Sequence, residues 1–356
     1  MKATIAGLGQ WLPERTIGND AWPPEFSAKA RAASNREFAE TPVEGHDAYE
    51  QLMQRRVDAE RGDPFLATVR RHVADEAMTA CEAEALAGRA ALEDARLWPE
   101  DVDLVLSSSG VPDRITPANA ARVAHLVGAK GAGAIGIDVS CASVCAQVAF
   151  GAALIETGRA KTVLCTQSHL ITRIHPLMYP ASPLMGDAAT ALVLRAGDRP
   201  GFLGSTIVSH GDYWPAVTWA RGREVDPPWW KEGGPYVLGS LDPQATMRLP
   251  QQWIRMAVDT ITSVVRGAGR NVEDIDVIAS VQPRRWLPSA ICEALGLPEK
   301  TAPLTWDEIA HVGACGVVSN LMRARDEGAL RPGARVVFYG MGAGVTRAAA
   351  FFVWGA

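Results

Sequence analysis

The chain has 356 residues, 47% of them hydrophobic and 21% charged, which is typical of a globular protein and excludes a disordered, collagen-like or low-complexity chain. Lys and Arg number 35 against 40 Asp and Glu, so the net charge is −5 and no nucleic-acid partner is expected. The six cysteines include no CxxC pair, which favours neither a disulfide framework nor a metal site and predicts reduced thiols in a cytoplasmic protein.

The chain carries no signal for a membrane. Residues 1–16 lack a charged head followed by a long apolar core, and the most apolar stretch, Cys145 to Ile155, is too short to cross a bilayer. We therefore expect no membrane partner.

The first recognisable elements begin at Leu86, where helical apolar spacing leads through a proline-containing break into a β-rich run that ends at Ser109. The same order of elements recurs from Val258. This alternation of helix and strand is typical of an α/β protein.

The recurrence extends to the residues themselves. Two pairs of segments match at offsets of 173 and 174 residues: 100–104 with 273–277, and 158–164 with 332–338. A repeat of about half the chain predicts two similar α/β halves, residues 1–196 and 197–356, joined by the turn 197–201.

The same offset places Cys141 opposite Cys315. Each of them opens an apolar helical run that ends at a glycine, over residues 142–157 and 316–327. An internal twofold axis would bring these helix starts together, and with them His311 toward Cys141. The sequence therefore predicts a Cys141–His311 pair.

Cys141 itself follows the strand-like segment 134–139 and precedes a long apolar helix. The positive end of a helix lowers the pKa of a nearby thiol, so this position favours a nucleophilic cysteine. The alternative is a buried cysteine that only packs.

A glycine-rich turn lies near the C-terminus. Residues 336–339 are β-rich, 340–346 contain Gly340, Gly342 and Gly344, and a second apolar run follows. No Lys-Ser/Thr pair and no helix pattern come after the glycines, so a phosphate loop is not indicated. We expect a tight turn between two strands, whose close backbone approach offers N–H groups to an oxyanion.

Four motifs in this order give the chain a resemblance to β-ketoacyl-ACP synthase III-like enzymes of the thiolase superfamily: Ile5–Pro13, Asp138–Cys141, Gly186–Ala191 and Gly342–Thr346. The resemblance implies a duplicated thiolase fold, layered α-β-α-β-α about an internal pseudo-twofold, and a homodimer. It also implies that Cys141 accepts the acyl group and that the Gly344 N–H completes an oxyanion hole with the Cys141 N–H.

The chain departs from the family pattern at two motifs. Where the family carries His-Gln-Ala-Asn, residues 281–284 read Val-Gln-Pro-Arg, so the histidine is replaced by Val281. The family's Gly-Asn-Thr-Ser aligns with residues 313–316, where Ala314 replaces the asparagine. His311 is the histidine nearest to this second motif.

The departures favour acyl transfer, because the family's decarboxylating condensation is attributed to the missing His/Asn pair, whereas a thioester needs only an activated thiol and an oxyanion hole. We expect an acyltransferase that loads Cys141 from an acyl-ACP or acyl-CoA and passes the acyl group to an O, N or C nucleophile of a small-molecule acceptor in specialised, polyketide-type metabolism. His311 is the expected base that deprotonates the acceptor. The phosphopantetheine of ACP or CoA would arrive as substrate, with no resident cofactor.

Two other functions stay open. A decarboxylative condensing enzyme for chain initiation would need Gln282 and His311 to share the enolate-stabilising work. A catalytically silent synthase partner is disfavoured by the presence of Cys141 and of the glycine turn.

Further candidate residues surround this site. His210 and Trp214 are predicted to bind substrate, Trp214 at the start of a Trp- and Pro-rich segment, 214–253, expected to form an apolar, loop-rich cap. Thr116 stands where relatives carry a large residue that reaches the partner subunit's acyl pocket, which would make the pocket roomier. His169 and His175 are ranked lower, as residues that line the site or close the dimer.

Overall fold

The computed structural model describes residues 1–37, 47–199, 201–220 and 237–355. Strands of the first half form one five-stranded sheet in the order β1 (Lys2–Trp11), β7 (Ala188–Gly197), β6 (Thr162–His169), β4 (Leu104–Ser109) and β5 (Gly133–Gly136). β7 is antiparallel to both of its neighbours, β1 and β6, whereas β4 runs parallel to both β6 and β5. β4 and β6 are buried along their whole length, as expected of strands that are covered on both faces.

Strands of the second half form a four-stranded sheet with the same pairing. Its order is β11 (Val277–Ser280), β12 (Arg335–Gly342), β13 (Thr346–Val353) and β8 (Phe202–Ser209). β11 and β12 are parallel, and β12–β13 and β13–β8 are antiparallel, which repeats β4–β6–β7–β1. The predicted duplication is confirmed.

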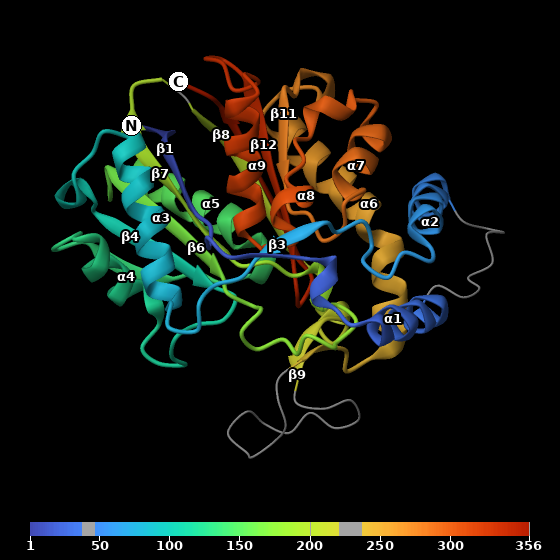
Figure 1. Ribbon diagram of the computed structural model, residues 1–356. Helices are drawn as coiled ribbons and strands as arrows, with labels where there is room; N and C mark the ends of the chain where they lie inside the picture. The colour runs from blue at the N-terminus through green and yellow to red at the C-terminus, as the bar shows by residue number, and fades with distance from the viewer. Residues whose placement is uncertain (38–46, 200, 221–236, 356) are drawn as a thin grey trace.

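Helices complete five layers (Figure 1). Between the two sheets lie α5 (Ser143–Glu156) and α9 (Cys315–Asp326), of which α5 contacts strands of both sheets. The first sheet is covered outside by α3 (Ala80–Asp94) and α4 (Asn119–Val127), the second by α6 (Pro243–Gly267) and α7 (Leu287–Leu295). The α-β-α-β-α layering that the resemblance implies is confirmed.

The remaining elements are short or peripheral. They are α1 (Pro24–Glu37), α2 (Ala48–Glu60), α8 (Trp306–Ile309), the strand pairs β2 (Thr16–Gly18) with β3 (Arg70–His72) and β9 (Thr218–Ala220) with β10 (Val237–Gly239), and the 3-10 turns Asn19–Ala21, Pro99–Asp101, Ser140–Ala142, Ser182–Leu184, Gly211–Tyr213, Val272–Asp274 and Glu299–Thr301. None of the described helices combines the length and the apolarity that a membrane span requires.

The matched segments of the sequence repeat are equivalent in detail. The 3-10 turn before β4 is closed by the Asp101 carboxylate, which accepts the N–H of Trp98 at 2.8 Å. The turn before β11 is closed in the same way by Asp274, which accepts the N–H of Asn271 at 3.0 Å. The short acidic motif therefore recurs because both turns need the same carboxylate cap.

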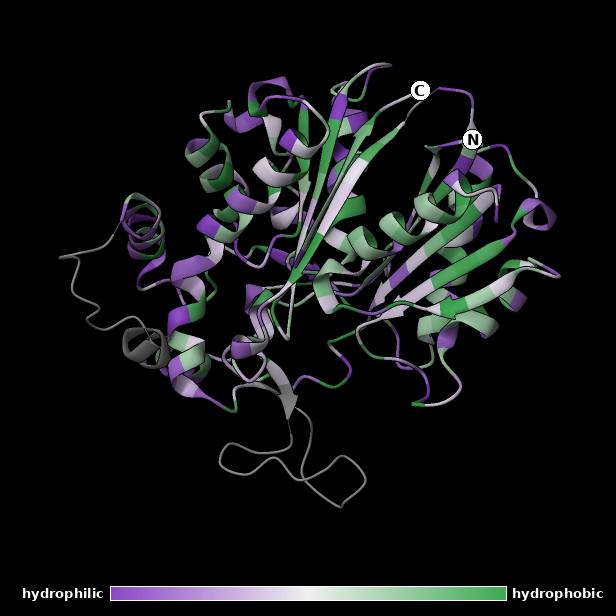
Figure 2. Ribbon diagram, turned by 180° about the vertical axis from the view of Figure 1, so that it is seen from behind, coloured by the Kyte–Doolittle hydropathy of each residue, from purple (hydrophilic) through white to green (hydrophobic). Residues whose placement is uncertain are grey.

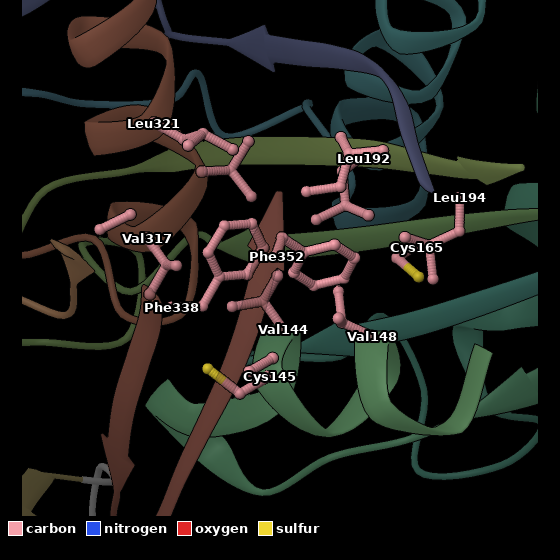
Figure 3. Packing of buried hydrophobic residues seen from close by; sticks show 14 of the residues in the cluster. Val144, Cys145, Val148, Cys165, Leu192, Leu194, Val317, Leu321, Phe338 and Phe352 are labelled. Atoms are coloured by element: carbon pink, nitrogen blue, oxygen red, sulfur yellow. The ribbon is translucent and has the colours of Figure 1, made fainter. Parts of the chain in front are cut away.

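The core lies between the two sheets, around the central helices. Figure 3 shows Val144 and Val148 of α5 packed against Phe338 and Phe352 of the second sheet, with Leu192 of the first sheet on the other side. Apolar residues follow the inner strands and α5 in Figure 2. Burying each such side chain stabilises the fold by about 1.5–3 kcal/mol. The first residues of α5, 143–148, are buried, whereas Phe150 and Ala153 further along the helix are exposed.

The Trp- and Pro-rich segment differs from its prediction. Helix α6 begins inside it, at Pro243, and Pro250 lies within the helix, so residues 243–253 are helical and not a loop. The Asp242 side chain accepts the N–H groups of Gln244 and Ala245, and the proline at the first helical position has no N–H to satisfy. Residues 221–236 of the segment lie outside the described chain.

Candidate active site

Cys141 lies in a one-turn 3-10 helix, Ser140–Ala142, between β5 and α5. The preceding Ser140 has φ +54°, a left-handed conformation that costs about 1–2 kcal/mol for a residue with a side chain. The Asp138 carboxylate accepts the Ser140 N–H at 2.6 Å, and the Ser143 hydroxyl accepts the Val139 N–H at 2.9 Å. These bonds hold the strained turn that presents the thiol.

The glycine turn packs directly against this segment. A Cβ at Gly342 would lie 2.1 Å from the Val139 carbonyl oxygen and 3.0 Å from the Cys141 nitrogen, and a Cβ at Gly340 would lie 2.7 Å from the Ala142 Cα. The predicted strand–turn–strand and its close backbone approach are confirmed. Gly344 has φ +75° at the tip of the turn, and its N–H as an oxyanion donor stays a prediction.

His311 stands beside Cys141, as the pseudo-twofold predicted. Its Nε2 lies 3.7 Å from Sγ of Cys141. The main chain of His311 is held by two bonds, from its N–H to the Leu184 carbonyl at 2.8 Å and from the Gly186 N–H to its carbonyl at 3.0 Å. Ala310, just before it, has φ +58°, so a second strained residue positions the second reactive group.

A backbone carbonyl sets the tautomer of His311. Its Nδ1 lies 3.0 Å from the Gln282 carbonyl oxygen, which can only accept, so the ring proton is on Nδ1 and Nε2 presents a lone pair to Cys141. Burial, and then the neighbouring His169, lower the pKa of His311 to about 3. The imidazole is therefore a neutral base at physiological pH.

The thiol of Cys141 differs from its prediction. Burial, and then the Asp138 carboxylate, raise the pKa of Cys141 to about 12, although the Cys141 backbone N–H lowers it. The expected lowering by the helix end is wrong, because desolvation of the thiolate outweighs it and α5 begins two residues later, at Ser143. At neutral pH the pair is a thiol that donates to a neutral imidazole, not a preformed thiolate.

His169, ranked low from the sequence, is a third member of the cluster. It ends strand β6, and its ring centroid lies 5.6 Å from that of His311 with the ring planes at 69°. Its Nδ1 lies 2.9 Å from the Gly186 carbonyl oxygen, and burial lowers its pKa to about 4. The signal that could have identified it is its position, because the carboxyl ends of parallel strands meet at one edge of the sheet.

Gln282 is close to the site, but its side chain is turned away from it. The amide donates to the Pro303 carbonyl and to Asn320 Oδ1, and its oxygen accepts from the N–H and hydroxyl of Thr305. Only its backbone carbonyl meets the site, through His311. The structure therefore gives Gln282 a positioning contact, and substrate binding by its side chain stays a prediction.

The other predicted substrate-binding residues lie apart from the cluster. Thr116 is exposed, Trp214 is 58% exposed, and His210 lies at the start of a 3-10 turn, with its N–H on the Val345 carbonyl. None of the three lines the cavity described below. A role in binding substrate is for them still a prediction.

One cavity of about 420 Å³ joins the reactive groups. Cys141, His311 and His169 line it, as does Ala314 where the family pattern has asparagine. The larger apolar side chains of its wall are Leu184, Met185, Val217, Leu249, Trp253 and Met341. Part of the Trp- and Pro-rich segment thus forms the predicted apolar wall, and the volume suits a small-molecule or acyl ligand.

Within the described ranges, no three His, Cys, Asp or Glu side chains are grouped so as to hold a metal ion. The chemistry that the cluster supports by itself is nucleophilic: a thiol, a base in contact with it and a second histidine in one apolar cavity.

The chain matches two family models, 3-oxoacyl-[acyl-carrier-protein] synthase III over residues 135–211 and the C-terminal part of the same synthase over 265–354. It is 30% identical to a β-ketoacyl-[acyl-carrier-protein] synthase III of Streptomyces coelicolor over 294 residues, covering 80% of this chain and 85% of the relative. It is 27% identical to a protein of the same name from Bordetella petrii over 347 residues, 97% of this chain and 95% of the relative.

Solved structures show the same fold. The 3-oxoacyl-(acyl carrier protein) synthase III of Pseudomonas aeruginosa superposes with a TM-score of 0.77 at 23% identity, covering 100% of this chain and 99% of that one. The priming β-ketosynthase of the R1128 polyketide pathway superposes with a TM-score of 0.77 at 22% identity, covering 99% and 96%. With the matched models and relatives, the chain belongs to the β-ketoacyl-[acyl-carrier-protein] synthase III family of the thiolase superfamily.

Proposed function

We propose that this family member is an acyltransferase that takes an acyl group from an acyl-ACP or acyl-CoA onto Cys141 and passes it to a hydroxyl or amine of a small molecule. The likeness to a polyketide priming ketosynthase supports a setting in specialised, polyketide-type metabolism. His311 serves Cys141 in the first half of this reaction.

Acylation follows from the contact between the thiol and the imidazole. Nε2 of His311 takes the Cys141 proton as sulfur attacks the thioester carbonyl of the donor, and the pantetheine thiolate that leaves takes the proton back. The bond from the Cys141 sulfur to the acyl carbon forms as the donor's sulfur–carbon bond breaks, so no oxidant or reductant is needed. Because the pKa of Cys141 is raised, the base in contact with it is required for this step.

The tautomer of His311 is the observation that favours acyl transfer rather than decarboxylative condensation. Decarboxylative condensation develops an enolate oxygen, which N–H donors must stabilise. Nε2 of His311 is an acceptor, since its Nδ1 is bound to a carbonyl, and the two family positions that supply donors hold the apolar Val281 and Ala314. Acyl transfer needs no enolate donor, and forming the Cys141 thioester needs a proton acceptor beside the sulfur, which the His311 ring offers.

Chain-initiating condensation is the second candidate function, and the names of the Streptomyces and Bordetella relatives favour it. It would require His311 to change tautomer and to donate from Nε2. A silent partner subunit is disfavoured by the strained turn that presents Cys141 and by the base beside it.

Intact-mass measurement after incubation with panels of acyl-CoAs and acyl-ACPs tests the proposal. We expect one acyl increment, lost in Cys141→Ala and retained in Cys292→Ala, a control that removes a buried thiol of α7 outside the cavity. Malonyl thioester added to the acylated enzyme should release no CO₂. Rapid release that depends on the acylated cysteine would overturn the transferase in favour of condensation, and no increment with any donor would overturn both.

The assembly proposed with this function is a homodimer. Among the described strands β5 is an edge strand that pairs with β4 alone. Ile135 on it is 42% exposed, so the outer edge of β5 and this apolar side chain can meet a second copy. Sedimentation should give twice the mass of the chain, and Ile135→Lys should shift it toward the monomer. A wild-type monomer at all concentrations would contradict this arrangement.

A further inference from the structure

Gly186 connects the two histidines of the cavity. Its N–H donates to the His311 carbonyl at 3.0 Å, and its carbonyl oxygen lies 2.9 Å from Nδ1 of His169. A Cβ at this position would lie 2.3 Å from the Ile309 carbonyl oxygen, so only glycine allows the close approach. One residue thus places a ring from the first half beside a ring from the second.

His169 has the same tautomer as His311. The Gly186 carbonyl can only accept, so the proton of His169 is on Nδ1, and Nε2 carries a lone pair. Among the residues that the structure describes, Nε2 of His169 has no hydrogen-bond partner. The ring nevertheless lines the cavity together with Cys141 and His311.

The packing around the ring is tight. A Cβ at Gly313, whose φ is +56°, would lie 2.6 Å from Cδ2 and 3.2 Å from Nε2 of His169, and a Cβ at Gly110 would lie 3.3 Å from Cδ2. Two glycines therefore leave room for an imidazole here and hold it in one orientation. His169 is buried and lines the cavity, so its ring lies where a bound acceptor can be reached.

Acyl transfer needs a base twice. In the first half-reaction the proton is on the Cys141 sulfur, and His311 is in contact with that atom. In the second half-reaction the proton is on the acceptor's oxygen or nitrogen, which approaches the carbonyl carbon and not the sulfur. We propose that His169 is the catalytic base for this second step, which takes the proton of the acceptor while His311 serves the thiol.

This inference rests on the proposed function, and in the transfer step every bond that forms is matched by one that breaks. The acceptor's O–H or N–H proton goes to Nε2 of His169, the new C–O or C–N bond forms, and the bond from the acyl carbon to Sγ breaks. His169 then gives this proton up by way of His311 to the Cys141 thiolate: the two ring centroids are 5.6 Å apart, and Nε2 of His311 lies 3.7 Å from the sulfur. From the sequence, His311 alone was expected to deprotonate the acceptor.

His169→Asn is the matched variant, because the asparagine amide can still donate to the Gly186 carbonyl but has no basic nitrogen in the place of Nε2. His125→Asn, on the exposed end of α4, is the control. The acylated enzyme is prepared with acetyl-CoA or the best donor found, freed of donor, and mixed with ethanol, trifluoroethanol or CoA. Loss of the acyl mass is followed in time.

We expect His169→Asn to load normally and to return the acyl group to CoA at the wild-type rate, because a thiol ionises without that base. Transfer to ethanol should fall by about 10²-fold or more, and transfer to the more acidic trifluoroethanol should fall less. His169→Gln fills the space of the ring with another uncharged amide and should give the same result as His169→Asn. It takes the place of His169→Asn in the experiment if that variant does not form the acyl-enzyme.

Three outcomes would overturn the role of His169. Transfer to ethanol within about two-fold of wild type would show that no base was removed. An equal loss with all three acceptors, CoA included, would make the residue a structural support. Failure of both variants to load would place it in the first half-reaction. If wild type itself fails to load with any donor, it is the proposed function that fails.

Discussion

Nε2 of His311 lies 3.7 Å from Sγ of Cys141, although 170 residues separate them in the chain. Each residue follows one in a left-handed conformation, Ser140 in the first half and Ala310 in the second. Because two independent strained turns converge on one contact, the contact is a built feature of the fold.

Removal of the imidazole should impair loading. His311→Ala leaves a thiol whose pKa is raised to about 12 by burial, and with no base beside it acylation should slow by about 10²–10⁴-fold. Single-turnover acylation with an acyl-CoA measures the effect. Loading at the wild-type rate would mean that His311 does not serve Cys141, and His169 would then be tested as its base.

The buried histidines should make stability depend on pH. The pKa values of His169 and His311 are lowered to about 4 and about 3, so near pH 5–6 the unfolded chain binds more protons than the folded one. Stability therefore falls as pH drops below about 6.5, by up to about 1.4 kcal/mol per pH unit for each histidine. Urea unfolding of wild type and His169→Asn between pH 5 and 8 should give a shallower slope for the variant. Identical slopes would contradict burial of a neutral His169.

Gly342→Ala should disable the site while the fold remains. The added methyl would meet the Val139 carbonyl at 2.1 Å and the Cys141 nitrogen at 3.0 Å, and the turn that carries the thiol would have to move. We expect acylation to fall by about 10²-fold, the cost of a misplacement of about 1 Å. Gly204→Ala in β8, where nothing lies within 4 Å of the added Cβ, is the control and should load like wild type. Normal loading in Gly342→Ala would show that the turn tolerates displacement.

A buried carboxyl beneath the cavity should stabilise the first half. Glu84 of α3 accepts hydrogen bonds from Ser107, Ser109, Thr166 and Ser168 at 2.5–2.9 Å. Glu84→Leu leaves four hydroxyls without their acceptor and should cost about 3–5 kcal/mol, and Glu84→Gln should cost less. Urea unfolding measures both, with Glu93→Gln on the exposed face of the same helix as the control. Glu84→Leu within about 0.5 kcal/mol of wild type would refute a structural role for this network.

The architecture and the first pair of the site could be predicted from the sequence. Hydrophobic periodicity and turn chemistry are local, so they recur wherever a half-chain unit is duplicated. The offset of 174 residues placed Cys141 opposite Cys315 and so predicted that His311 lies near Cys141. The glycine turn was predicted for the same reason, since close approach demands glycine in any context.

Tertiary structure alone decided the chemistry of that pair. The tautomer of His311 depends on the carbonyl of Gln282, and the orientation of His169 on that of Gly186, neither of which is near its histidine in the chain. The raised pKa of Cys141 results from burial summed over segments of both halves, which opposed the local effect of the helix end. A sequence names the groups that are able to react, but protonation is set by the atoms that surround them in space, and these come together only in the fold.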